Sequence, residues 1–239
     1  MKTKKFNERF TVVPVARIEN DYKEKFGVPR QSGRANGISK ITLLPPYNVA
    51  EAVRGIGNFT HLWLIFGFSL NTQPQEGAFS PTVRPPRLGG NERVGVFASR
   101  SPFRPNPLGL SCVKLEKVEF PREGGVVLYV SGADAVNGTP IYDIKPYLPS
   151  ADKIENAKGG YADEHAADAL SVIFPETLLE KIPQEKRESL LACLRDDPRP
   201  AYQCDGTRVY GMRFAKFNVR FYVKEGELTV CDVSKAEED

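Results

Sequence analysis

The first 150 residues of this chain hold seven short segments that are rich in β-branched and aromatic residues and are separated by turn-forming residues. Such side chains favour strands, whereas Gly and Pro, of which the chain has 20 and 19, interrupt regular structure. The expected strands span residues 11–18, 41–44, 59–70, 93–98, 110–120, 126–131 and 139–144. Six or seven strands in so short a stretch predict a closed or nearly closed barrel, because closure removes exposed strand edges.

The β-rich part has room for one short helix, at residues 49–56. Asn48 can cap it, and Glu51 follows three residues later, which is the spacing of a capping box. His61 and Trp63 lie in the apolar strand 59–70. We expect a hydrogen-bonded structural histidine and a core tryptophan at these two positions.

The pattern changes after residue 150, where residues 151–167 lose all periodicity and are typical of a linker. A strand at 169–174 and a helix opened by Pro183 follow. That helix has Leu190, Leu191 and Leu194 on one face. Further strands are expected at 208–214, 217–223 and 228–233, and in the second of these apolar and polar residues alternate. Residues 1–150 and 168–239 are therefore expected to form a barrel and a small α+β domain.

Several classes of protein are excluded by what the chain lacks. No GxGxxG motif follows a strand, and there is no P-loop, so a Rossmann nucleotide site is not expected. The four cysteines and two histidines have no metal-ligand spacing, which argues against a zinc site. The longest apolar run, residues 62–68, is far too short to cross a bilayer, and the first ten residues do not resemble a signal peptide. We therefore expect no metal, no membrane and a cytoplasmic location with reduced thiols.

Arginines are concentrated around the expected strand at 93–98. Between residues 83 and 105 only Glu92 opposes them, although the net charge of the whole chain is only +3. The five arginines are Arg84, Arg87, Arg93, Arg100 and Arg104. Three prolines stiffen the loop that carries the last two, and a guanidinium fork suits phosphate or carboxylate. The alternative is a structural loop whose arginines lie in water.

Polar groups also occur at the expected barrel rim, in residues 131–147. Asn137-Gly138 between two strands is a hairpin signal, and Asp134, Asp143 and Lys145 alternate with apolar residues there. Such a rim can hold a ligand, although a tight turn alone would explain the pattern. In the second domain, Arg199 and Tyr202 lie in a proline-bounded loop that could stack on a base and pair with phosphate.

Six motifs occur in order over nearly the whole chain. They are PRQ at 29–31, FTHLWLIF at 59–66, RPPRLGG at 84–90, GVFASRSPFRPNPLG at 95–109, NGTPIYDIKPY at 137–147 and DPRPAY at 197–202. Together they closely resemble the TsaA-like family, which includes the TrmO-type tRNA methyltransferases. The resemblance implies a single-sheeted, non-Rossmann β-barrel that binds S-adenosyl-L-methionine and works as a homodimer. It also implies an acceptor, N6-threonylcarbamoyladenosine in the tRNA anticodon stem-loop, next to the anticodon, which is methylated on N6.

The resemblance assigns site residues by matching motifs. Cofactor contacts are expected at Pro29, Arg30, Gln31, Phe68, Ser69, Leu70, Arg100, Leu110, Asp134, Ala135, Val136, Asn137 and Gly138. Candidate substrate contacts are Arg84, Arg87, Arg104, Lys145, Arg199 and Tyr202. Methyl transfer depends mainly on positioning, but the acceptor N6 belongs to a urea and is weakly nucleophilic. Asp134 or Asp143 is therefore a candidate general base.

Two other functions fit the same residues. A non-catalytic RNA-binding module would bind tRNA without binding the cofactor. A small-molecule methyltransferase would bind the cofactor without needing its arginine clusters.

Overall fold

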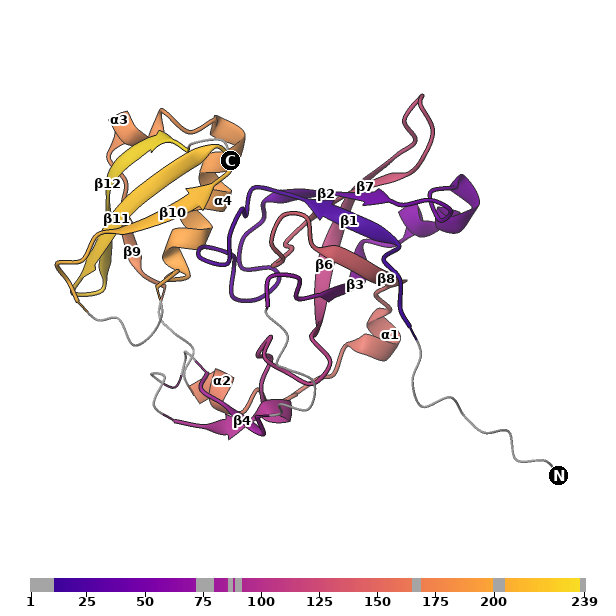
Figure 1. Ribbon diagram of the computed structural model, residues 1–239, viewed down its shortest axis with the longest axis horizontal. Helices are drawn as coiled ribbons and strands as arrows, with labels where there is room; N and C mark the ends of the chain where they lie inside the picture. Colours follow the sequence, from indigo (N-terminus) through magenta and orange to yellow (C-terminus); the bar gives the residue numbers. More distant parts are fainter. Residues whose placement is uncertain are drawn as a thin grey trace.

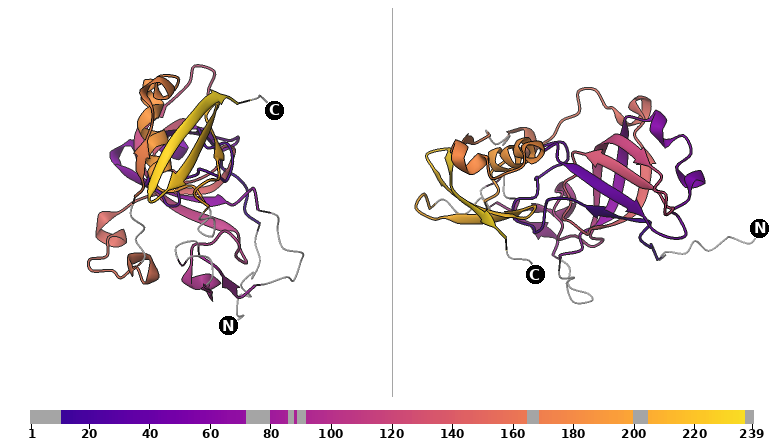
Figure 2. Two further views of the ribbon diagram at one scale, coloured as in Figure 1. Left: turned by 90° about the vertical axis from the view of Figure 1, so that its left-hand side faces the viewer. Right: turned by 90° about the horizontal axis from the view of Figure 1, so that it is seen from above.

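The computed structural model describes residues 11–71, 80–85, 88, 92–164, 169–199 and 205–236. Two larger sheets organise them, a closed barrel and a four-stranded sheet. They lie at opposite ends of the long axis of the molecule, as Figure 1 and the right-hand view of Figure 2 show. The barrel is formed by the first part of the chain and the second sheet by the last part.

Six antiparallel strands close the barrel in the order β1-β2-β7-β6-β3-β8. Their bounds are β1 (Ala16–Glu19), β2 (Ile38–Leu43), β3 (His61–Gly67), β6 (Leu108–Glu119), β7 (Val127–Ser131) and β8 (Pro140–Pro146). The prediction of a mainly β fold built on a closed barrel is therefore confirmed.

Strand β3 shows how the alternation of side chains fills the barrel. Leu62, Leu64 and Phe66 are buried inside it, while His61 and Trp63 lie on the outer face and are half-buried. The expectation of a core tryptophan is wrong, because the period of two places residue 63 outside. There its indole Nε1 donates a hydrogen bond of 3.0 Å to Oδ2 of Asp152. His61 is hydrogen-bonded, with Nδ1 3.0 Å from Oγ1 of Thr60.

Three further local predictions are wrong. Residues 49–56 form no α-helix but two 3₁₀ turns, Ala50–Val53 and Ile56–Asn58, because Val49 holds the N-cap position and has no side-chain acceptor. The expected strand 93–98 is only β5 (Val94–Gly95), paired with β4 (Thr82–Val83), followed by the 3₁₀ turn Val96–Ala98.

The third is the hairpin at Asn137-Gly138. It does not form, because β7 pairs with β2 and β6 whereas β8 pairs with β1 and β3. Residues 132–139 instead connect two strands that are not neighbours. They still turn at Gly138, whose φ is 82°.

The second sheet has the order β10-β11-β12-β9 and carries α4 on one side. Its elements are β9 (Ser171–Ile173), α3 (Glu176–Leu179), α4 (Gln184–Arg195), β10 (Tyr210–Phe214), β11 (Phe217–Lys224) and β12 (Glu227–Lys235). Leu190, Cys193 and Leu194 of α4 are buried against it. The alternation expected in β11 is present, with Phe217 and Phe221 both on the buried face.

Two short helices lie at and within the stretch expected to be a linker: α1 (Pro149–Asp152) overlaps its start, and α2 (Tyr161–Glu164) lies inside it. The β1–β2 connection reaches across from the barrel to the second sheet, where its Tyr22 and Ala35 are buried in the core of that sheet. The two halves are therefore packed together by a long loop of the barrel.

No helix among the described residues is long and apolar enough to span a membrane. Within the same residues no group of three or more His, Cys, Asp and Glu side chains could hold a metal ion. Cys112, Cys193 and Cys231 form no disulfide, and Cys204 and His165 lie outside the described residues.

Candidate functional site

Two adjoining cavities open at the end of the barrel where β3 ends and the β7–β8 connection begins. They enclose about 540 Å³ and about 190 Å³ and share Phe66, Phe68, Pro102 and Asp134 in their walls. Of the expected cofactor residues, those that line them are Pro29, Arg30, Gln31, Phe68, Ser69, Leu70, Arg100, Leu110, Asp134, Ala135 and Val136. Segments far apart in the sequence therefore meet at one place, which we call the rim groove.

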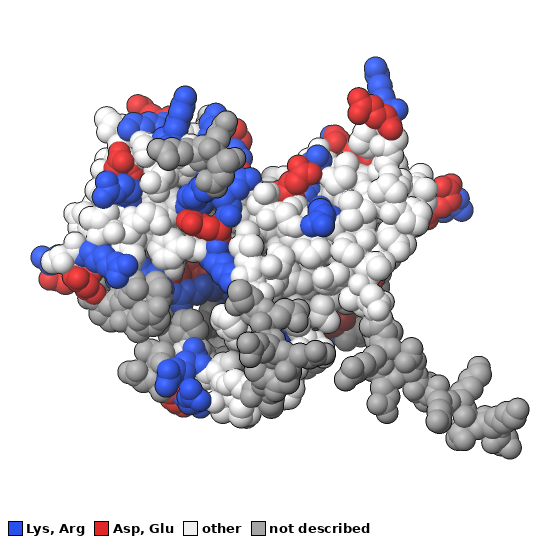
Figure 3. Space-filling view, viewed as in Figure 1, with Lys and Arg blue, Asp and Glu red and all other residues white. Residues whose placement is uncertain are grey.

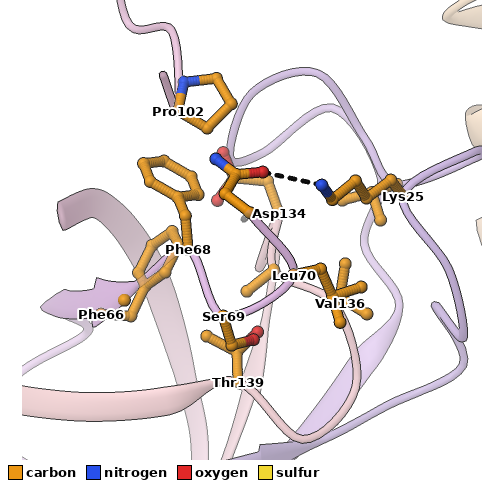
Figure 4. A pocket seen from close by; sticks show the side chains of 13 residues that line it. Lys25, Phe66, Phe68, Ser69, Leu70, Pro102, Asp134, Val136 and Thr139 are labelled. Atoms are coloured by element: carbon orange, nitrogen blue, oxygen red, sulfur yellow. Dashed lines mark hydrogen bonds between the residues drawn. The ribbon is translucent and has the colours of Figure 1, made fainter. Parts of the chain in front are cut away.

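One wall of the rim groove is aromatic. The rings of Phe66 and Phe68 lie edge to face, 5.5 Å apart at 75°. A Cβ atom at Gly109 would overlap the Phe66 ring, so the glycine on the neighbouring strand β6 leaves the space that this ring occupies. Figure 4 shows the two rings on one side of the cavity, with Lys25 and Val136 on the other.

Asp134 lies between these walls (Figure 4) and is half-buried. Its Oδ1 accepts a short hydrogen bond from Oγ of Ser111, a buried residue of β6. Burial raises the pKa of the Asp134 carboxyl above its ordinary value, although the hydrogen bond from Ser111 and the charge of Arg100 act in the opposite direction. A carboxylate with a raised pKa is a better proton acceptor than one that is fully solvated.

Arg100 and Gln31 form the polar side of the rim groove. Nη1 of Arg100 donates a hydrogen bond of 2.6 Å to Oε1 of Gln31. Arg104, in the same proline-rich loop, donates from Nη1 to the carbonyl oxygen of Ser99 at 3.1 Å, which braces the loop from within. Two loops are thus joined beside Asp134.

Lys25 and Asn71 close the smaller cavity. Nζ of Lys25 donates a hydrogen bond of 2.8 Å to Oδ1 of Asn71. The amide Nδ2 of Asn71 is buried and has no hydrogen-bond partner among the described residues. A buried donor without a partner is costly, so this atom is suited to a bound acceptor.

Asn137 and Gly138 support the rim groove without lining either cavity. Oδ1 of Asn137 accepts a hydrogen bond of 2.9 Å from the backbone N–H of Asn20. The carbonyl oxygen of Gly138 accepts one of 3.1 Å from Nη1 of Arg17. Their role in the structure is to fix the turn that presents Asp134 and Ala135.

Arg30 behaves differently from its neighbours Pro29 and Gln31. Its guanidinium Nη2 donates to the carbonyl oxygens of Asp197 and Arg199, at 2.5 Å and 3.0 Å. Both acceptors belong to the second domain. Arg30 therefore contributes to the wall of the groove while its terminal nitrogen is engaged elsewhere.

A second hollow, which we call the interdomain groove, lies between the Arg-rich loops and the second domain. It encloses about 660 Å³ and its wall includes Lys25, Arg84, Arg100, Phe103, Tyr161 and Arg199. Basic side chains gather around the hollow between the two halves on the face shown in Figure 3. Arg199 also pairs with Asp197 in its own loop through two contacts of 2.9 Å. The interdomain groove joins the rim groove at Arg100, Pro102 and residues 29–31.

Asp143 and Lys145 line neither groove. They alternate with the inward-facing residues of β8, lie on the outer wall of the barrel and pair with each other at 2.8 Å. The bulge opposite Ile65 and Phe66 shifts the register of β8. Asp143 therefore lies on the outer wall of the barrel and not at its rim, where it was expected. Arg87 and Tyr202 lie outside the described residues.

Several residues of the rim groove were not expected from the sequence, among them Phe66, Ser111 and Asn71. The alternation of β3 could have shown that Phe66 points inward at the end of its strand. The alternation of β6 could likewise have shown that the Ser111 hydroxyl points inward among apolar residues. Nothing in the sequence marks Asn71.

Comparison with known proteins gives matches over most of the chain. The family model of the tRNA-methyltransferase O N-terminal domain matches residues 17–153, and that of the TrmO C-terminal domain matches residues 167–236. The tRNA (adenine(37)-N6)-methyltransferase of Escherichia coli is 45% identical over an alignment of 224 positions, which covers 89% of this chain and 93% of that protein. A Pseudomonas aeruginosa protein named "Putative S-adenosylmethionine-dependent methyltransferase RcsF" is 38% identical over 94% of this chain and 97% of its own length. A crystal structure of TrmO from P. aeruginosa covers 98% of this chain and 100% of its own, with a TM-score of 0.76 at 31% identity.

Proposed function

The chain belongs to the tRNA-methyltransferase O family, and on this premise we propose that it is an S-adenosylmethionine-dependent methyltransferase that acts on N6 of an adenosine in tRNA. We propose further that the acceptor is N6-threonylcarbamoyladenosine next to the anticodon. The observation that carries the proposal is the position of Asp134. It is a half-buried carboxyl with a raised pKa in the rim groove, which adjoins a groove lined by basic residues.

The residues of the rim groove fit the cofactor. Aromatic faces and a carboxylate suit a sulfonium cation, and the groove offers both in Phe66, Phe68 and Asp134. Donors suit the carboxylate and the adenine of the cofactor, and the groove offers Arg100 and the unpartnered Nδ2 of Asn71. When bound, S-adenosylmethionine supplies a methyl group that is activated by the positive sulfur.

The interdomain groove suits the acceptor. Lys25, Arg84 and Arg100 give it positive charge, which favours tRNA phosphates and the threonyl carboxylate. The exposed ring of Phe103 offers a flat apolar face on which a base could stack. An anticodon-loop base is already single-stranded, so turning it into the groove has a small energetic cost. Arg199 is a further candidate in this groove, whereas Arg104 lines the rim groove and Lys145 lines neither groove. Arg87 and Tyr202 stay predictions.

Asp134 is the proposed general base. The acceptor N6 is conjugated to the carbonyl of a urea, so its lone pair becomes available for attack as its proton leaves. Asp134 would accept that proton while N6 displaces the sulfur from the methyl carbon, so that one N–C bond forms and one S–C bond breaks. The hydrogen bond from Ser111 fixes the orientation of the Asp134 carboxyl.

We propose that the protein works as a homodimer. Phe97, Leu108 and Leu110 are exposed by 75%, 42% and 57%, and all three line the outer part of the rim groove. Large apolar side chains gathered on one surface are typical of interaction sites. A second copy of the chain that covered them would also shield the groove from water.

Methyl transfer from labelled S-adenosylmethionine to bulk tRNA tests the proposed function. Digestion of the product should place the label in the N6-methylated form of threonylcarbamoyladenosine. If the protein bound tRNA but not the cofactor, it would be an RNA-binding module. If it methylated small acceptors and left tRNA unlabelled, it would be a small-molecule methyltransferase. Either result would overturn the proposal.

A further inference from the structure

A short piece of the β1–β2 connection, residues 20–22, lies between the rim groove and the second domain. On the side of the groove, Nδ2 of buried Asn20 donates a hydrogen bond of 2.8 Å to the carbonyl oxygen of Ala135. The backbone N–H of Asn137 donates one of 2.7 Å to the carbonyl oxygen of Tyr22. Residues 20–22 thus hold the turn that carries Asp134 and Ala135.

The same piece is bonded to the second domain on its other side. The carbonyl oxygen of Asp21 accepts a hydrogen bond of 2.8 Å from the backbone N–H of Ala215. Oδ2 of Asp21 pairs at 2.5 Å with Nζ of Lys186 on α4, and both side chains are mostly buried. The ring of Tyr22 packs against Phe214 at a centroid distance of 6.2 Å.

Arg30 links a second part of the β1–β2 connection to the second domain. Its backbone N–H donates a hydrogen bond of 3.0 Å to Oδ2 of Asp196, at the end of α4. Its guanidinium binds two carbonyl oxygens of residues 197–199, as described above. Because Gln31 follows directly and accepts the hydrogen bond from Arg100, these contacts also fix the partner of Arg100.

We propose that the second domain positions the cofactor site of the barrel by holding the β1–β2 connection at two points, through Asp196 at Arg30 and through Lys186 at Asp21. The inference rests on the proposed function, because it concerns the affinity for S-adenosylmethionine. Asp196 and Lys186 are positioning residues in this account, since neither lines the rim groove.

The inference changes what the two domains are expected to do. If the barrel alone bound the cofactor and the second domain alone bound RNA, the interface between them would have no role in cofactor binding. Here the loop 197–199 lines the interdomain groove and also binds Arg30. A tRNA contact with this loop is therefore coupled to cofactor affinity, and the coupling acts equally in both directions.

Calorimetric titration of S-adenosylmethionine into full-length variants tests the inference. Asp196→Ala removes the acceptor for the Arg30 N–H, and Lys186→Met removes the partner of Asp21. Each should raise the dissociation constant about five- to tenfold, while kcat at saturating cofactor stays within about twofold of the wild type. Asp196→Asn keeps a side-chain oxygen that can accept from Arg30, so it should restore most of the affinity.

Glu188→Gln is the matched control, because Glu188 is a 77% exposed residue of the same helix whose partner is Arg195. It should leave the affinity unchanged. Suppose that the wild type binds the cofactor and that both Asp196→Ala and Lys186→Met bind it with the same affinity. The inference is then overturned, while the proposed function stands. If the wild type binds no cofactor at all, the proposed function is overturned and the inference falls with it. A fall in kcat with unchanged affinity would also contradict a positioning role at the cofactor site.

Discussion

Nη1 of Arg100 lies 2.6 Å from Oε1 of Gln31, to which it donates a hydrogen bond, although 69 residues separate the two in the chain. The contact joins the proline-stiffened Arg loop to the β1–β2 connection beside Asp134. It also leaves Arg100 on the wall of both the rim groove and the interdomain groove. Arg100 is thus the side chain through which the proposed cofactor and RNA sites meet.

Arg100→Ala should weaken S-adenosylmethionine binding. Losing a hydrogen bond to a charged group costs about 1.5–3 kcal/mol, which corresponds to a dissociation constant raised at least about tenfold. Isothermal titration calorimetry measures it, with Arg54→Ala as the control, because Arg54 is 79% exposed in a surface pair with Glu51. Equal affinity of a folded Arg100→Ala variant would remove Arg100 from the cofactor site.

Asp134→Asn should raise the free energy of unfolding at neutral pH. The folded-state pKa of Asp134 is raised by burial, so its contribution to stability is fully present below the ordinary pKa of an aspartate and is lost as the pH rises through the folded pKa. The amide has no such dependence and can still accept the hydrogen bond from Ser111. Denaturant titrations should therefore show that the variant has a higher free energy of unfolding than the wild type at pH 7. This difference should be smaller at pH 3.

The exposed carboxylate of Asp143 provides the control for that experiment, because Asp143→Asn removes no buried charge. Asp143→Asn should show no comparable increase in the free energy of unfolding at pH 7. An Asp134→Asn variant that was less stable than the wild type at both pH values would mean that the carboxylate itself is needed for folding.

A tRNA that lacks the threonylcarbamoyl group should be a poor acceptor. Without the threonyl carboxylate, the basic residues of the interdomain groove lose a charged partner, and a site built for such a group discriminates strongly against its absence. Initial rates on matched tRNAs, with and without the group, measure the ratio of kcat/KM. A ratio near one would point to unmodified adenosine as the substrate.

Arg84→Ala should weaken tRNA binding and lower its salt dependence. If Arg84 neutralises one phosphate, the slope of log K against log salt should become shallower by about one. Filter binding or fluorescence anisotropy over a salt series gives the slope. Arg122→Ala, in the exposed β6–β7 connection, is the control and should leave the slope unchanged. A slope that Arg84→Ala did not alter would place Arg84 away from the RNA backbone.

The barrel was predictable because its signals are local. The apolar run of β3 and the turn residues between strands act within a few positions, so the strands could be found from the sequence alone. The same holds for the alternation of apolar and polar residues in β11 of the second sheet. The pairing of β7 and β8 with other strands could not be found in this way. A turn signal such as Asn137-Gly138 specifies a local bend, whereas strand order depends on contacts between distant segments.

The candidate site was also predictable only where its signals are local. The motifs identified Gln31, Arg100 and Asp134 as members of one site, and the structure places them together. They could not show that the Arg30 guanidinium turns toward the second domain, because its acceptors are backbone carbonyls of residues 197 and 199. Any residue type offers such acceptors, so no pattern in the sequence marks them. The bulge in β8 that keeps Asp143 on the outer wall is hidden for the same reason.

The single-turnover rate of methyl transfer to tRNA by Asp134→Asn tests the central claim most directly. With enzyme and S-adenosylmethionine both saturating, the variant should transfer the methyl group about 10²- to 10⁴-fold more slowly than the wild type, as expected for loss of a general base. The rate of the wild type should fall in acid, with a midpoint above the ordinary pKa of an aspartate, because burial raises the pKa of Asp134. A folded Asp134→Asn variant that methylated tRNA at the wild-type rate would contradict the claim that Asp134 carries the chemistry.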